Sequence, residues 1–357
     1  MKKSRANSPT RHNGISAEER ERLQQGADLA ALARAFGPPP VRGALRSRPT
    51  DFLVDEELAF PLKGEGEHLY LRLRKTGQNT RWVGKQLARR LGLPPKAIGF
   101  AGLKDRHAVT SQWFSVHLPG RTDPAPDDVT IDGVELIEAV RHTAKLRTGA
   151  LSGNRFRILI RDLTGDREAL SERLVALRSQ PVPNYFGAQR FGHDGRNLDL
   201  FAMPADRADR DTRSFGLSAL RSALFNLWLA ARVEGDRWRT PMDGEIVWLP
   251  AEGRHLHMAK VEGQEQVFPT GLLWGAGDNQ ATDAALRVER DFFGGFPDTI
   301  AVLAAFDTRM MRRPLCLSIA ELEFELLGNE LELAFSLRRG QFATSAIREL
   351  GDFFDAS

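Results

Sequence analysis

The sequence predicts an α+β fold, in which helices pack on a mixed, largely antiparallel β-sheet. Several segments alternate apolar and polar residues with the period of a half-buried strand, and they do not alternate regularly with helices as a parallel sheet requires. Neither glycine-rich phosphate-binding pattern, G-x-G-x-x-G or G-x-x-x-x-G-K-[ST], occurs in the chain. A length of 357 residues is large for one hydrophobic core, so two domains are expected.

The first predicted elements are a helix and two strands. Ser16 and Glu19 have the spacing of a capping box, which predicts a helix that runs to about Phe36 and ends at Gly37. Residues 50–58 and 68–74 each predict a strand with one exposed face.

A second helix is predicted to begin at Thr80 as its cap. Val83, Leu87 and Leu91 share one face of this helix, and Gly92 ends it. Its polar face carries four basic residues: Arg81, Lys85, Arg89 and Arg90.

The remaining elements follow the same two periods. Asp166 is expected to cap a helix that presents Leu170 and Leu174. Strands are predicted at residues 113–118, 134–140, 156–160, 245–249, 255–260 and 330–337, and further helices at 217–233, at 282–293 and from about 344.

Composition narrows the class of protein. With 41% hydrophobic and 27% charged residues, the chain has the composition of a globular protein. Cys316 is its single cysteine, so an internal disulfide and a thiolate metal cluster are excluded, and no His or acidic residue beside His255 and His257 has a ligand spacing. We therefore expect no metal. The basic start, residues 1–12, lacks an apolar segment, and no run of 18 apolar residues occurs, so a cytoplasmic protein without a membrane partner is expected.

Positive charge is concentrated in the first part of the chain. Residues 1–160 contain 27 Lys and Arg against 17 Asp and Glu, although the net charge of the whole chain is only +3. Between Glu138 and Asp162 there are six basic residues and no acid: Arg141, Lys145, Arg147, Arg155, Arg157 and Arg161. This basic strip resembles a surface that follows a phosphate backbone, and the alternative is a solvated face. We interpret it as a nucleic-acid surface.

Residues 100–112, FAGLKDRHAVTSQ, predict a carboxylate on a loop between two strands. An apolar segment ends at Phe100, and a second apolar run begins after Gln112. Asp105 lies between Lys104 and Arg106, whose charges favour its ionised form. Such a carboxylate suits a nucleophile or a base, although a triplet of this kind can also be a solvated turn.

Residues 183–197, PNYFGAQRFGHDGRN, form a second candidate site. Three aromatic residues, three glycines and three side-chain amides crowd a predicted connection between helices. The alternative is a buried aromatic plug beneath a glycine turn. A third candidate is the loop 338–345, where Phe342 precedes a helix and serves either as a stacking surface or as a hydrophobic staple.

These loops together resemble the TruD family of tRNA pseudouridine synthases. The fixed positions of the pattern G-x-K-D-[KR]-x-A-x-T-x-Q match Gly102, Lys104, Asp105, Arg106, Ala108, Thr110 and Gln112. The segments NYFGAQRFG, G-x-F-A-T-S and D-F-x-V-x-E also match, at residues 184–192, 340–345 and 51–56. The resemblance implies that Asp105 is catalytic and that Phe52, Asn184, Phe186 and Phe342 contact the substrate.

The resemblance also implies a domain arrangement and a substrate. Residues 1–209 and 317–357 are expected to form the catalytic domain, with residues 1–40 as an N-terminal tail and helix, and residues 210–316 an inserted TruD-type α/β domain. The expected substrate is tRNA, at uridine 13, and the expected chemistry uses no cofactor and no metal. We expect a monomer.

The residues themselves leave several roles open. Asp105 either attacks the anomeric carbon of the ribose or removes a ribose proton. Lys104 and Arg106 are expected to hold Asp105 or the flanking phosphates, with Arg141, Lys145, Arg147 and Arg155 as further phosphate contacts. Two other classes of function are a non-catalytic RNA-binding or assembly factor, and an RNA or nucleoside hydrolase, which would pair Asp105 with a second acid or a metal.

Overall fold

A computed structural model describes residues 14–201, 210–263, 266–306 and 308–357. The basic segment at residues 1–12 lies outside these ranges. The chain divides into two compact units, each built from two stretches of sequence: Met1–Gly37 with Pro183–Leu317 (unit 1), and Pro38–Val182 with Ser318–Ser357 (unit 2). Each unit is described by itself.

The N-terminal helix belongs to unit 1 and not to the unit that contains Asp105, where the sequence had placed it. This helix, α1 (Ala17–Ala27), packs against α4 (Arg210–Glu234), and the two backbones come so close that a Cβ on Gly26 would lie 2.5 Å from the Ala223 carbonyl oxygen. The amide of Asn226 donates to the Gly26 carbonyl at 2.9 Å. Residues 183–209, also predicted for the catalytic domain, fall in unit 1 as well.

A ten-stranded sheet forms the frame of unit 2, and its central order is β14-β15-β7-β2-β5-β3-β6. Two of its strand pairs, β1 with β16 and β2 with β5, are parallel, and the others are antiparallel. The strands are β1 (Val41–Leu45), β2 (Phe52–Leu58), β3 (His68–Thr76), β4 (Ile98–Phe100), β5 (Val109–His117), β6 (Val134–His142), β7 (Leu151–Gly165), β14 (Ala320–Leu327), β15 (Glu330–Arg338) and β16 (Asp352–Asp355). This sheet confirms the predicted α+β class.

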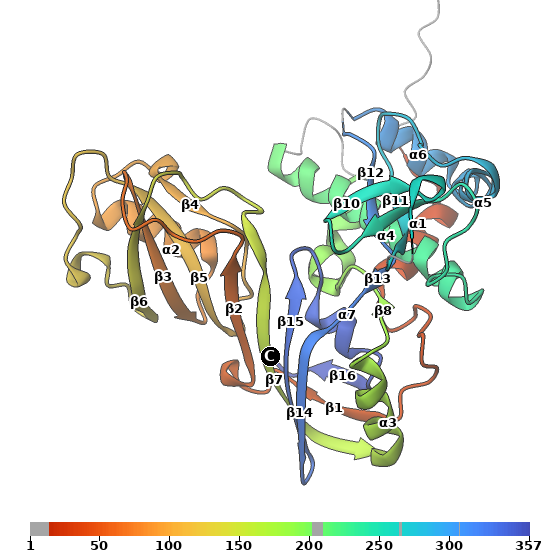
Figure 1. The fold of residues 1–357 in the computed structure, drawn as a ribbon, viewed down its shortest axis with the longest axis horizontal. Helices are drawn as coiled ribbons and strands as arrows, with labels where there is room; N and C mark the ends of the chain where they lie inside the picture. Colours follow the sequence, from red (N-terminus) through yellow and green to blue (C-terminus); the bar gives the residue numbers. More distant parts are fainter. Residues whose placement is uncertain (1–13, 202–209, 264–265, 307) are drawn as a thin grey trace, which may run out of the picture. The chain divides into compact units, whose positions relative to one another are not determined.

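One face of this sheet is covered by α2 (Thr80–Arg90), which lies over β3 and β5 in Figure 1. Val83 and Leu87 of the helix are completely buried against Leu71 of β3 and Phe114 of β5. This alternation of apolar residues along β3 and the helical spacing along α2 are what the sequence predicted.

The predicted N-caps were right at Asp166 and Ser16 and wrong at Thr80. Asp166 accepts a hydrogen bond from the Ala169 amide and caps α3 (Arg167–Leu177), as predicted. Asn79, not Thr80, caps α2, because its side chain accepts from the Arg81 amide at 2.9 Å. Ser16 caps α1 by accepting from the Glu19 amide at 3.5 Å, but the Glu19 carboxylate does not complete the predicted capping box. It accepts instead from the Asp298 and Thr299 amides, and α1 ends at Ala27.

The short helical turns of unit 2 are η1 (Pro49–Asp51), η2 (Pro95–Ala97) and η3 (Pro126–Val129), and its last helix is α7 (Ala343–Ile347). Unit 1 contains η4 (Ala188–Arg190), η5 (His193–Phe201), η6 (Met258–Lys260), α5 (Asp283–Gly294) and α6 (Pro297–Ala304). Its four-stranded sheet has the order β10 (Arg254–His257), β9 (Ile246–Leu249), β11 (Phe268–Leu273) and β12 (Met311–Pro314). A two-stranded ladder pairs β8 (Val182–Pro183) with β13 (Cys316–Leu317).

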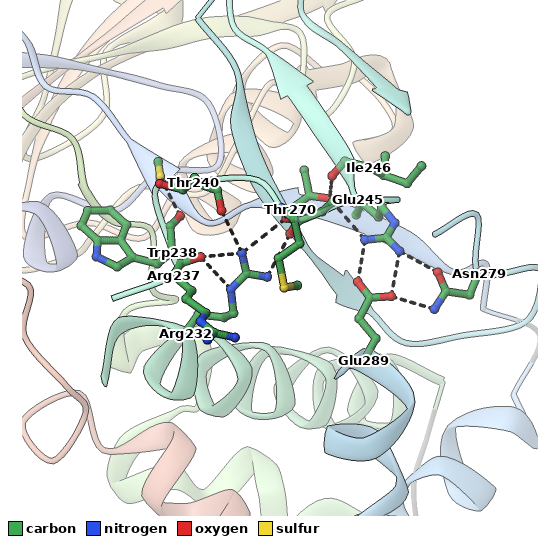
Figure 2. A network of polar contacts seen from close by, with 12 residues as sticks. Arg232, Arg237, Trp238, Thr240, Glu245, Ile246, Thr270, Asn279 and Glu289 are labelled. Carbon is green, nitrogen blue, oxygen red and sulfur yellow. Dashed lines mark hydrogen bonds and ion pairs between the residues drawn. The ribbon is translucent and has the colours of Figure 1, made fainter. Parts of the chain in front are cut away.

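Two buried ion pairs fix the helices of unit 1 to its sheet (Figure 2). Arg232 of α4 lies 3.0 Å from Glu245, and Arg312 of β12 lies 2.8 Å from Glu289 of α5. The Glu289 carboxylate also accepts from the Asn279 amide at 2.7 Å. Burial raises the pKa of Glu245, although Arg232 opposes this shift. The partners satisfy one another, so these charges are retained inside the unit.

No helix in the described ranges is long and apolar enough to cross a membrane.

Candidate active site

Asp105 lies on a loop of residues 101–108 that joins β4 to β5 in unit 2. Its side chain is 36% exposed, so a carboxylate oxygen is accessible from outside the protein. Other residues of the matched pattern, among them Lys104 and Gln112, hold the loop. The loop therefore presents this carboxylate on a fixed backbone.

A hydrogen-bond chain joins the loop to the beginning of α2. The Lys104 amide donates to the Thr80 hydroxyl at 3.0 Å, and this hydroxyl donates to the Gln112 side-chain oxygen at 2.8 Å. The Gln112 amide in turn donates to the Gly102 carbonyl at 3.4 Å. Thr80 and Gln112 are both buried, so the chain is shielded from water.

The side chains of the two basic neighbours point to partners other than the Asp105 carboxylate. The Lys104 amine lies 2.6 Å from the carboxylate of Glu56, which is completely buried, and Glu56 also accepts from the Trp113 amide. Arg106 is exposed, and its Nε donates to the Gly77 carbonyl at 3.0 Å. Lys104 is thus a structural cation beneath the loop and is closed to a phosphate, which corrects the role expected from its place in the sequence.

Lys75 supports the loop from inside the protein. Its amine donates to the Asp105 backbone carbonyl at 2.8 Å, and only 1% of the residue is exposed. Burial lowers the pKa of Lys75 to about 8, while the nearby charge of Asp105 acts in the opposite direction. Burying a lysine amine costs free energy, so packing alone does not explain a lysine at this position.

Arg46 is the cation that faces the Asp105 carboxylate. Its guanidinium lies 3.3 Å from Asp105 and 2.6 Å from Asp355, and it therefore joins the end of β16 to the loop. The backbone φ of Arg46 is 59°, in the left-handed region that non-glycine residues rarely adopt, and this conformation turns the chain after β1. Its Nε is buried without a hydrogen-bond partner in the described chain.

Phe52 supports Arg46 and is itself closed to solvent. The Arg46 guanidinium lies 4.3 Å from the centre of the Phe52 ring, and only 2% of Phe52 is exposed. Its other neighbour, Phe156, makes an edge-to-face contact at 6.1 Å. Phe342 is partly buried and precedes α7 as its N-cap residue. The structure places both aromatic residues in unit 2 with Asp105.

Asn184 and Phe186 lie in unit 1, where Arg313 holds both. The Asn184 side chain accepts from Arg313 at 2.6 Å and donates to the Pro314 carbonyl at 2.8 Å. The Arg313 guanidinium lies 4.1 Å above the ring of Phe186, whose backbone amide donates to the Asn226 side chain. Burial and the nearby charge of Arg190 lower the pKa of Arg313.

Most of the predicted basic strip is engaged by other parts of unit 2. Arg155 lies 3.2 Å from Glu321 of β14, and Arg157 lies 3.6 Å from Glu332 of the neighbouring strand β15. Further along β7, Arg161 makes a bidentate contact with the buried Asp51, whose hydrogen bonds raise the pKa of Arg161.

The other end of the basic strip is similar. Arg141 binds Asp123 and three backbone carbonyls, and the Lys145 amine donates to the Lys96 carbonyl. Lys145 and Arg147 are the two of the six that are exposed and make no ion pair with any residue that the structure describes. The strip is therefore largely a set of structural ion pairs and hydrogen bonds.

Sequence reasoning missed Arg46, Lys75 and Arg313. A signal existed for Lys75, because Leu69, Leu71, Leu73 and Lys75 alternate onto the same buried face of β3. No local pattern marks Arg46, whose partners lie 59 and 309 residues away. Arg313 and Asn184 are likewise 129 residues apart.

No group of three or more His, Cys, Asp or Glu side chains within the described ranges is arranged to hold a metal ion.

Comparison with known proteins identifies the family. The family model "tRNA pseudouridine synthase D (TruD)" matches residues 32–200 and 206–350. The chain is 43% identical to a tRNA pseudouridine synthase D of Methylococcus capsulatus, covering 90% of this chain and 94% of the relative, and 41% identical to one of Xanthomonas axonopodis pv. citri, covering 92% and 97%.

A solved structure shares the fold. The crystal structure of a protein assigned as tRNA pseudouridine synthase D from Methanosarcina mazei superposes with a TM-score of 0.64 at 20% identity, over 89% of this chain and 95% of that one. These matches define the class of protein as the pseudouridine synthases, which are isomerases. The chain belongs to the tRNA pseudouridine synthase D (TruD) family.

Proposed function

We propose that this chain converts a uridine of tRNA to pseudouridine, with the Asp105 carboxylate as the catalytic group. The observation that carries the proposal is the loop itself. Thr80, Gln112, Lys104 and Lys75 anchor its backbone from below, while the Asp105 side chain remains about one-third exposed. The names of the curated relatives support tRNA as the substrate, and the family resemblance suggests uridine 13.

The reaction is an isomerisation in which no atom is gained or lost. The bond between C1′ of the ribose and N1 of uracil breaks, the uracil turns over, C1′ bonds to C5, and the C5 proton leaves while N1 gains one. Asp105 either attacks C1′ or removes a ribose proton, and both roles require the carboxylate form. The ion pair with Arg46 favours that form.

The uridine must leave its base stack to reach such a carboxylate. This costs a few kcal/mol, and stacking on aromatic side chains at about 1–3 kcal/mol per base offsets the cost. Phe342, in the same unit as Asp105, is the candidate for this stacking. The family resemblance also gives a substrate contact to Asn184 and Phe186 of unit 1, and both of these residues are buried within that unit. The Arg46 guanidinium covers the ring of Phe52, so Phe52 contributes to the site by supporting Arg46. A base can stack on this ring only if Arg46 moves.

A hydrolase is less well supported. Its second acid would have to be Asp355, which shares Arg46 with Asp105. Although burial raises the pKa of Asp355, hydrogen bonds from Ser357 and the charge of Arg46 outweigh burial and lower it. A carboxyl group of lowered pKa is a poor general acid at neutral pH.

The test is the variant Asp105→Asn. We expect pseudouridine formation on a tRNA transcript to be abolished under single-turnover conditions, while tRNA affinity changes less than about twofold, because the amide keeps the size of the side chain but is neither a nucleophile nor a base. Pseudouridine is detected by chemical mapping, and free uracil by chromatography. Turnover retained by the variant would refute the role of Asp105, and uracil release by the wild type would favour the hydrolase.

A further inference from the structure

The outer face of α2 is a basic surface whose cations have no carboxylate partner. Lys85, Arg89 and Arg90 are exposed, and none of them makes an ion pair with any residue in the described part of the chain. The helix itself, TRWVGKQLARR, contains no acidic residue. The acidic turn η3 packs against α2, yet Asp128 of this turn accepts from the Ala125 amide and not from a helix cation.

The structural explanation for these charges is incomplete. Arg89 and Arg90 lie in the last turn, where the helix dipole favours positive charge. Lys85 lies in the middle of the helix, one turn before Arg89, and like charges at this spacing destabilise a helix by about 0.2–0.5 kcal/mol. Trp82, which is 38% exposed, precedes Lys85 by three residues and therefore lies on the same side. An exposed tryptophan therefore lies beside cations that have no carboxylate partner.

The beginning of this helix is tied to the Asp105 loop. The Thr80 hydroxyl, in the first residue of α2, accepts from the Lys104 amide at 3.0 Å, and Arg106 donates to the Gly77 carbonyl, three residues before the helix. Eleven residues of helix are about 16 Å long at 1.5 Å per residue, which is close to five base steps of about 3.4 Å. The helix that carries the basic face therefore begins at the Asp105 loop.

We propose that this face of α2, formed by Trp82, Lys85, Arg89 and Arg90, binds the phosphodiester backbone of the RNA whose uridine enters at Asp105. The inference rests on the proposed function, and it names the surface that carries the flanking RNA. Cations without a protein partner are available to neutralise phosphates, and the counterions condensed on the RNA backbone are released when they do so. Trp82 provides an aromatic surface for an unpaired base beside that backbone.

The experiment compares two double variants that remove the same charge. Lys85→Gln with Arg89→Gln removes two of the proposed contacts. The matched control, Arg42→Gln with Arg74→Gln, removes two exposed arginines that already face Asp352 and Glu135 at 3.5 and 3.2 Å. Circular dichroism and the melting temperature establish that all the proteins are folded. The binding of a full tRNA transcript is then titrated against salt.

We expect the α2 variant to flatten the slope of log affinity against log salt by about 1.4–1.8, at 0.7–0.9 for each lost contact, and the control to keep the wild-type slope. Single-turnover pseudouridine formation by the control at saturating enzyme should stay within twofold of wild type, because Asp105, its loop and the α2 face are intact. An unchanged slope for the α2 variant, or an equal change in the control, would overturn the inference. Failure of the proposed function is separate, since the wild-type protein would then make no pseudouridine whatever the slopes.

Discussion

The arginines of β7 and the cations of α2 differ in what lies opposite each charge. On β7 other strands of the same sheet supply the acids, so that Arg155 faces Glu321 of β14, and Arg157 and Arg161 face Glu332 and Glu330 of β15. The helix α2 contains no acid, and the acidic turn η3 that packs against it makes no ion pair with Lys85, Arg89 or Arg90 in the described part of the chain. A run of basic residues is thus a poor guide to a phosphate surface on a strand and a better guide on a helix, because cross-strand partners lie far away in sequence.

The largest effect is expected on the free energy of unfolding, at the partly buried contact between Arg161 of the strip and Asp51. In Asp51→Asn the bidentate contact to Arg161 is lost, and we expect the free energy of unfolding to fall by about 2–3 kcal/mol, less than the 3–5 typical of a fully buried pair because Arg161 is one-quarter exposed. Urea unfolding at pH 7 measures this loss. The salt slope of tRNA binding should not change.

The pH dependence of the Asp51 variant gives an internal check. Hydrogen bonds from Arg161 lower the pKa of Asp51 below 3.8, with burial opposing them. A lowered carboxyl pKa stabilises the folded state above the unfolded value, and this contribution is lost as the pH falls through the folded value. The stabilities of wild type and variant should therefore converge in acid. Curves that stay parallel down to pH 3 would contradict the assignment.

Lys75 extends the comparison to a buried cation without an ion-pair partner in the described part of the chain, and here the expected pH dependence of stability has a different cause. Its pKa of about 8 in the folded protein lies below the 10.5 of the free side chain, so the unfolded chain binds more protons between these values. Wild-type stability should rise with pH from 8 to 10.5, by up to about 3 kcal/mol at 1.36 kcal/mol per pKa unit.

The variant Lys75→Met should lack this rise and be no less stable than wild type at pH 7. Its pseudouridine formation should nevertheless slow, because the hydrogen bond to the Asp105 carbonyl that positions the loop is gone. Unfolding curves at pH 7.5, 9 and 10 and single-turnover rates at pH 7 provide the measurements. A stable variant with wild-type rates would show that Lys75 does not position Asp105.

The smallest effect is expected on the exposed part of the strip. Neutralising Arg155 and Arg157 together should change the salt slope of tRNA binding by less than about 0.5, because these arginines already have carboxylate partners and release few counterions. If the slope of log affinity against log salt instead falls as much as is expected for the α2 variant, β7 would be an RNA-binding surface after all.

The fold class was predictable because the alternation of apolar and polar residues in strands, and the spacing of apolar residues in helices, indicate directly which side chains are buried. The strand at residues 68–74 and the apolar face of α2 needed no information from elsewhere in the chain. The domain boundaries were harder to predict from the sequence. The position of α1 depends on contacts of Glu19 and Gly26 with residues about 200 to 280 positions away in the chain. Short polar residues also changed roles, as Thr80 shows by joining the Asp105 loop instead of capping its helix.

The candidate site was predicted only in part, for a similar reason. The pattern around Asp105 is local, and its members are brought together by one loop. Arg46, by contrast, directly follows another strand, β1, and its backbone adopts a left-handed conformation. No sequence pattern indicates this conformation at an arginine. Pairing along the sequence therefore suggested Lys104 as the partner of Asp105, whereas in the structure Lys104 belongs to Glu56.

The shared position of Arg46 between Asp105 and Asp355 has a consequence for charge balance during turnover. In either proposed role Asp105 loses its negative charge for part of the cycle, by forming an ester with the ribose or by accepting a proton. A guanidinium held only by Asp105 would then be left as an uncompensated, largely buried cation, which is costly. Asp355, 2.6 Å away, remains charged and acts as a permanent counterion. The carboxylate at the reacting sugar can therefore be neutralised and regenerated while the electrostatic environment around it stays nearly constant.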